Sequence, residues 1–124
     1  MAFGTTASIA FDRPGGGPCR PSRRPPVDLA HLARQSLGDR QVEAEVLSLF
    51  LGQTATVAQR LAAAGAAERR ALAHGLVGSA RAIGAFAIAD CAAEIEARPQ
   101  DASALRRLPR LIDDVREFVA SISR

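Results

Sequence analysis

One histidine, His74, lies among small residues and arginines at helical spacings within residues 73–84. On a helix that turns about 100° per residue, the apolar positions gather on one side and form a core-facing stripe. The members of this stripe are Leu72, Leu76, Ser79, Ala80 and Ile83. His74 lies about 200° from Leu72 on the same wheel, so we expect its imidazole to face solvent. The outward side also carries Arg70, Val77, Gly78 and Arg81.

An exposed neutral imidazole can act as a nucleophile toward a phosphoryl group, provided that a partner can approach it in line. Gly78 leaves this approach open, because residues four apart share a helix face and glycine has no side chain. Arg81 lies two turns after His74, about 10 Å along the axis, and its side chain leans back toward the histidine. Its guanidinium is therefore the candidate for holding a phosphate oxygen. Arg70 leans away, which makes it the poorer clamp and a candidate partner contact.

Residues 73–96 resemble the histidine phosphotransfer (HPt) domain of multistep phosphorelays. The resemblance rests on Ala73-His74-Gly75-Leu76-Val77-Gly78-Ser79-Ala80, Ile83-Gly84-Ala85, Ala89, Cys91-Ala92 and Glu94-Ile95-Glu96. That family's motif is His-x-Leu-Lys-Gly followed by Ser or Ala, on the second helix of a four-helix bundle. The resemblance implies that His74 takes a phosphoryl group from a receiver-domain aspartate and passes it to another. It is specific over residues 73–96 and architectural over residues 28–122.

The chain departs from that motif at Val77, where the family usually has a lysine. Three outcomes stay open: Arg81 compensates, phosphoryl-His74 is held less well, or the domain docks receivers without efficient transfer. Val77 is also a candidate for apolar contact area at the docking face. Gln53, on the preceding helix, is the candidate for orienting the imidazole, since related domains place a polar side chain there. A glutamine that only faces water is the alternative.

Periodicity and end signals predict five helices and no strand. We expect a short helix from Asp28 to Ser36, then four longer ones over about 39–65, 68–83, 87–97 and 101–122. The predicted N-caps are Asp28, Asp39 and either Asp101 or Ser103, and Gly65 is expected to end the second helix. Short connections favour antiparallel neighbours, so the predicted fold is an all-α, up-down-up-down four-helix bundle with a short extra N-terminal helix. Pro109 is expected to kink or restart the last helix near Leu108. His31, in the short helix, is interpreted as a surface or boundary residue.

Composition separates residues 1–27 from residues 28–124. The first stretch is rich in proline, glycine and arginine, which predicts a disordered leader before the helical domain. The net charge of +3 comes from that leader, because twelve arginines and twelve acids balance over residues 28–124. A near-neutral domain argues against nucleic-acid binding.

No apolar run approaches the ~20 residues of a membrane span, and Cys19 and Cys91 form no disulfide framework, so we expect a cytoplasmic protein.

Autonomous catalysis is not expected, because the chain has no Gly-rich phosphate loop and no set of metal ligands. The predicted function is that of a phosphoryl carrier in bacterial two-component signalling, with no cofactor of its own. Mg²⁺ is expected only on the partner receiver domain. Receiver domains are the expected partners, with a hybrid histidine kinase as a further candidate, and the protein is expected to be a monomer. The alternative is a non-phosphorylated adaptor that binds a receiver or kinase, for which Val77 is the best support.

Overall fold

The computed structural model describes residues 24–123 and contains five helices there. They are α1 Leu29–Ser36, α2 Arg40–Ala63, α3 Ala66–Ile83, α4 Phe86–Ala97 and α5 Ala102–Ile122. No strand occurs among the described residues, which confirms the predicted all-α class. The predicted leader lies outside the described residues as far as residue 23. Val27, at its end, is fully buried in the core.

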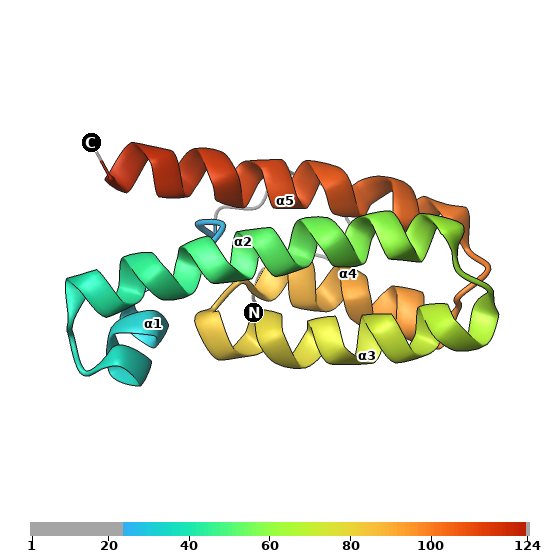
Figure 1. Ribbon diagram of the computed structural model, residues 1–124, viewed down its shortest axis with the longest axis horizontal. Coiled ribbons are helices and arrows are strands. Elements are labelled where there is room, and N and C mark those ends of the chain that lie inside the picture. Colours follow the sequence, from blue (N-terminus) through green and yellow to red (C-terminus); the bar gives the residue numbers. More distant parts are fainter. Residues whose placement is uncertain (1–23, 124) are drawn as a thin grey trace, which may run out of the picture.

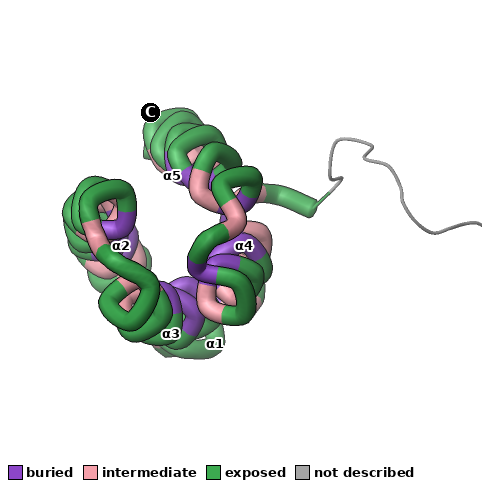
Figure 2. Tube along the Cα trace, turned by 90° about the vertical axis from the view of Figure 1, so that its right-hand side faces the viewer, coloured by how far each residue is buried: buried purple, intermediate pink, exposed green. Residues whose placement is uncertain are grey.

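The four longer helices pack around one core, with α2 against α3 and α5, and α4 also against α3 and α5 (Figures 1 and 2). Short connections reverse the chain direction from each of these helices to the next, as the ribbon in Figure 1 shows. The short helix α1 packs against α2 and α3 at one end of the assembly. The buried positions of the helices face one another in the end view of Figure 2.

Aspartate caps begin three of the five helices, as the sequence predicts. Asp28 accepts a hydrogen bond from the His31 backbone N–H at 3.0 Å, and Asp101 accepts one from Ser103 at 2.9 Å. Asp39 accepts from two backbone N–H groups at the start of α2. Such caps satisfy donors that have no partner within the helix. Gly65 differs from its expected role, because it is the N-cap of α3 and α2 has already ended at Ala63.

Small residues let α3 and α4 approach each other closely. Both helices bury alanines that are at most 1% exposed, namely Ala73, Ala80, Ala89 and Ala92. Ile88 and Ile95 of α4 fill the core beside them. Side chains at the edge of this helix pair can therefore reach across to one another. The candidate site lies at this edge.

The buried face of α3 is rotated from the face that the sequence predicts. Val77, expected to face outward beside His74, is only 8% exposed and belongs to the core, so that prediction is wrong. Ser79, expected in the core stripe, is exposed. The reason is that α3 has helices on two sides, α2 and α4, so its buried arc is wider than a single stripe and is centred between them.

The predicted restart of the last helix near Leu108 is also wrong, because α5 is one helix from Ala102 to Ile122 and contains Pro109. Proline removes one helical hydrogen bond and crowds the preceding turn, a local cost. Pro109 itself is exposed, while its neighbours Leu108 and Ile112 are buried in the core. This packing on both sides of the proline holds the two halves of α5 in one helix.

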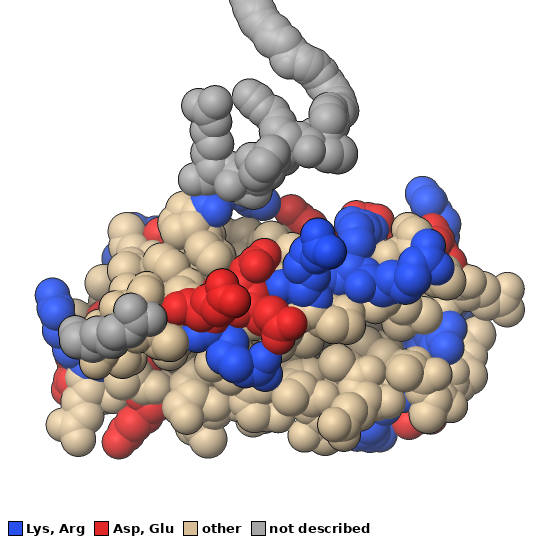
Figure 3. All heavy atoms as spheres, turned by 90° about the horizontal axis from the view of Figure 1, so that it is seen from above, with Lys and Arg blue, Asp and Glu red and all other residues tan. Residues whose placement is uncertain are grey.

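Charges of both signs share the face over α5 (Figure 3). The first half of α5 carries Arg106, Arg107 and Arg110, and the second half carries Asp113, Asp114 and Glu117 together with Arg116. Figure 3 shows the basic group beside the acidic one. Between residues 24 and 123, no helix has both the length and the apolar character required to cross a membrane.

Candidate functional site

His74 projects from α3 into solvent, with 77% of its side chain exposed. This confirms the outward orientation that the wheel predicts. Its Nδ1 lies 2.8 Å from Oε2 of Glu96, whose side chain is 34% exposed. An ionised carboxylate can only accept a hydrogen bond, so Nδ1 carries a proton and donates a hydrogen bond to Glu96. The lone pair of the neutral ring is then on Nε2.

Glu96 comes from the last turn of α4, and the sequence argument did not identify it as a site residue. Its position follows from the α3–α4 hairpin, because His74 and Glu96 are equally distant in sequence from Ala85 in the turn. Two antiparallel helices place such positions opposite each other. This symmetry about the turn is the signal that could have identified Glu96.

Two arginines of α3 flank the histidine, and their contacts differ. Arg70, one turn before His74, donates from Nε to the backbone oxygen of Glu96 at 3.4 Å. Arg81, the predicted phosphate clamp, is exposed, and its guanidinium makes no hydrogen bond or ion pair within residues 24–123. Glu96 therefore contacts both His74 and Arg70, whereas Arg81 extends into solvent.

Gly78 lies on the exposed surface of α3 one turn after His74. A Cβ built at Gly78 meets no atom within 4 Å, and the same is true of Gly75. Packing within the protein therefore does not require glycine at either position. Because they have no side chains, these glycines leave space beside His74 for a molecule that approaches from solvent.

Comparison with protein families decides what this helical domain is. The Hpt domain family matches residues 45–118, more than half of the chain. The chain belongs to the Hpt domain family. Membership implies histidine phosphotransfer in two-component phosphorelays, in which Hpt domains interact with receiver domains and kinases. No curated protein and no solved structure matches the chain.

The matched region of this Hpt domain includes all of α3 and α4 and most of α2 and α5. It therefore contains His74 and Glu96 together with the elements that position them. The helix α1 and the first turn of α2 precede it. The short N-terminal helix thus lies outside the matched region.

Gln53, predicted to orient the imidazole, is exposed on α2 and lines a groove of about 460 Å³ between α2 and α3. Gly75 and Ser79 line the same groove, and His74 does not. The structure thus places Gln53 on the α2 side of α3, while the imidazole bonds to Glu96 on the α4 side.

The second histidine of the Hpt protein, His31, has a different environment. Its half-buried ring meets Phe86 edge-on, with the centroids 5.3 Å apart. Its Nε2 is buried and has no hydrogen-bond partner in the described structure. This agrees with the boundary position that the sequence predicts. Among residues 24–123, no group of three histidine, cysteine or acidic side chains is arranged to hold a metal ion.

Proposed function

We propose that this Hpt protein accepts a phosphoryl group on Nε2 of His74 from a receiver-domain aspartyl phosphate and passes it to another receiver. One observation carries the proposal: the imidazole of His74 is exposed, and its Nδ1 is held by the Glu96 carboxylate, 2.8 Å away. This arrangement leaves Nε2 as the free nucleophile in the neutral ring. The scaffold is an up-down-up-down four-helix bundle.

The transfer step follows from the two ring nitrogens. Nε2 attacks phosphorus, the new N–P bond forms, and the P–O bond to the receiver aspartate breaks as the carboxylate leaves with the electron pair. The ring gains positive charge during this step, while its Nδ1 proton stays in the hydrogen bond to Glu96. The Glu96 carboxylate therefore stabilises the charge that develops on the ring. Donation to a second receiver aspartate reverses the same bonds.

The surface around His74 suits a receiver that must bring its aspartate close. Gly75 and Gly78 add no side chains beside the imidazole, and Ser79 adds a short one. The adjoining groove offers the partly buried apolar side chains of Leu72 and Val57. A receiver seated there would exclude water from the transfer, which strengthens the electrostatic contacts. The Mg²⁺ of the reaction belongs to the receiver in this proposal.

The proposal is tested with a phosphorylated receiver domain and the full-length protein. Wild type should acquire acid-labile phosphate, His74→Gln should acquire none, and His31→Gln should behave as wild type. The His31 variant is the matched control because it removes the other histidine. Equal labelling of wild type and His74→Gln would refute His74 as the acceptor. Measurable binding without any labelling would favour an adaptor.

The adaptor alternative has weaker support in the structure than in the sequence. It was supported by Val77, which stands where the family usually has a lysine and was a candidate for apolar area at the docking face. With an exposed fraction of 8%, Val77 belongs to the core, so only the missing lysine still supports an adaptor. Phosphotransfer is therefore the function that the site supports best.

A further inference from the structure

Phosphorylation of His74 would bring two anionic groups to one imidazole ring. Glu96 holds Nδ1 at 2.8 Å, and a phosphoryl group on Nε2 would add about two further negative charges at neutral pH. The positive charge that the ring gains offsets only part of this negative charge, so a cation near the phosphoryl oxygens would stabilise the phosphorylated state. Position 77 does not provide such a cation, because valine stands there and faces the core. Another position can provide it.

We propose that Arg70 provides this cation, holding the phosphoryl group of phospho-His74 from the α4 side of the site. The inference rests on the proposed function of His74. Arg70 lies one turn before His74, and positions four apart share a helix face. Its Nε bonds to the backbone oxygen of Glu96, while the side chain of the same residue bonds to His74. Glu96 thus contacts both side chains, the guanidinium through its backbone oxygen and the imidazole through its carboxylate.

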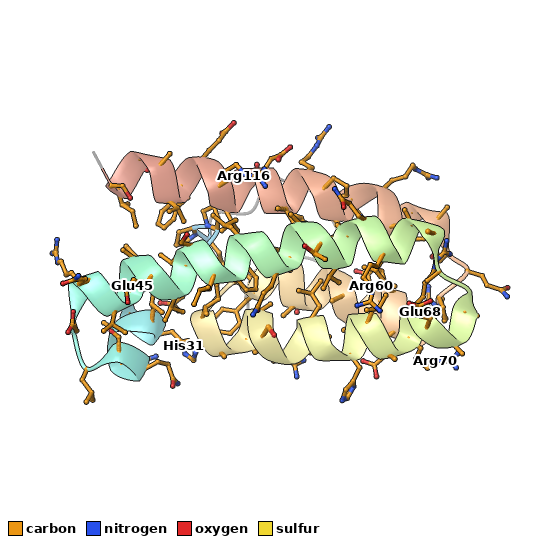
Figure 4. All side chains as sticks on the ribbon, in the orientation of Figure 1. His31, Glu45, Arg60, Glu68, Arg70 and Arg116 are labelled. Carbon is orange, nitrogen blue, oxygen red and sulfur yellow. The ribbon has the colours of Figure 1, made fainter. Side chains whose placement is uncertain are left out.

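The terminal nitrogens of Arg70 are available for a phosphate. In the described structure only its Nε makes a hydrogen bond, and the contact at 3.4 Å is long. Guanidinium N–H groups form strong charge-assisted bonds with phosphate oxygens. We therefore expect both terminal groups to turn toward the phosphoryl oxygens, while Nε stays near the end of α4. Figure 4 shows Arg70 on the N-terminal half of α3.

The neighbouring arginine has a different task, which makes it a matched control. Arg69 donates to the backbone oxygens of Leu61 at 2.8 Å and Pro99 at 2.9 Å, with a longer bond to Ala62. These contacts join the α2–α3 connection to the segment before α5. The guanidinium of Arg69 is thus committed to structure, whereas that of Arg70 has one long bond.

The other candidate cations have no observed link to the site. Arg81 lies seven residues from His74, about 10 Å along the helix axis, and has no polar contact with Glu96. Arg98 is exposed just beyond α4, also without a polar contact to His74 or Glu96. Arg70 alone among these arginines shares a bonding partner with the imidazole.

The test uses the full chain phosphorylated with phosphoramidate, so that no receiver is needed. Nε2 forms a bond to phosphorus, the P–N bond of the reagent breaks, and ammonia leaves with the electron pair. A ³¹P NMR titration then reports the pKa of the phosphoryl group. A guanidinium beside the dianion lowers this pKa, so Arg70→Ala should raise it by about half a unit at low salt, the range of an exposed ion pair.

Matched variants separate charge from structure. Arg70→Lys should recover part of the shift, because it keeps the positive charge without the planar donors. Arg69→Ala should lower stability without moving the phosphoryl pKa. Added salt should reduce the difference between wild type and Arg70→Ala, because an exposed ion pair is screened.

Each outcome decides a different statement. A titration of Arg70→Ala identical to that of wild type overturns the inference and leaves His74 as the acceptor. A shift in Arg81→Ala that is absent in Arg70→Ala assigns the cation to Arg81 and also overturns it. Failure of wild type to label on His74 under conditions that label free imidazole overturns the proposed function, and the inference with it.

Discussion

The two histidines of this protein lie on helices that touch, yet their ring nitrogens have opposite surroundings. His31 packs its ring against Phe86, and its Nε2 is sealed from solvent without a hydrogen-bond partner. His74 is 77% exposed, and its polar contact to Glu96 is made through Nδ1. Figure 4 shows His31 near the end of α3 that lies far from Arg70.

The comparison shows that the chemistry open to a histidine depends on which of its two ring nitrogens is accessible. An in-line attack needs a ring nitrogen that a phosphorus atom can reach. Packing closes off Nε2 of His31, whereas the contact of His74 occupies Nδ1 and leaves Nε2 free. The exposed ring is also prevented from swinging freely, because Glu96 fixes its orientation.

The largest effect on this contrast is expected when Glu96 is removed. Glu96→Ala leaves the His74 ring without a fixed tautomer or orientation, so we expect phosphoryl transfer from a receiver to slow by about 10- to 100-fold. Glu96→Gln keeps an oxygen that can accept from Nδ1, and it should stay within several-fold of wild type. Rapid-quench measurement of acid-labile phosphate gives both rates. Equal rates for Glu96→Ala and wild type would contradict an orienting role.

A smaller effect is expected when a large side chain is placed beside His74, so that access to its ring is limited as it is at His31. Gly78→Leu should lower the transfer rate by about tenfold, because its side chain would stand where the receiver approaches. Gly78→Ala is the control: a Cβ there meets nothing within 4 Å. We therefore expect alanine to raise the free energy of unfolding by about 0.5–1 kcal/mol. Urea unfolding and transfer kinetics, read together, separate the two effects, and a slow but well-folded Gly78→Ala would contradict this account.

The smallest effect on transfer is expected at His31. His31→Ala removes the ring contact with Phe86 and should lower the free energy of unfolding by about 1–2 kcal/mol. Phosphoryl transfer through His74 should stay within about twofold of wild type at temperatures where both proteins are folded, because this change touches neither Nε2 of His74 nor its partner Glu96. Thermal unfolding and the transfer assay provide the two measurements. A transfer defect in folded His31→Ala would link the two histidines and weaken the contrast.

Local signals in the sequence predicted the parts of the structure that local physics determines. Asp28 and Asp39 were predicted as caps, and Asp101 was one of two candidates for the last helix; each one accepts a backbone hydrogen bond at a helix start. The outward direction of His74 followed from helical periodicity alone. These features depend on residues within one or two turns of each other, which the sequence displays directly.

Features that depend on neighbouring helices were predicted less well. Val77 was placed outside because a single apolar stripe was assumed, while α3 has partners on two sides. Glu96 was missed because its contact with His74 spans the α3–α4 turn. A restart of the last helix at Pro109 was among the expectations because a local penalty was weighed without the packing of Leu108 and Ile112. In each case tertiary contacts outweighed a local rule.

Gly84 ties the N-terminal segment to the Hpt fold. It ends α3 with a φ of 84°, its oxygen accepts from the Asp28 N–H at 2.9 Å, and a Cβ there would come within 2.9 Å of the Asp28 oxygen. Asp28 precedes the region that matches the family, while Gly84 lies inside it. A side chain at position 84 would press against the backbone that leads into α1, so a substitution there would displace this segment as well as strain the left-handed end of α3.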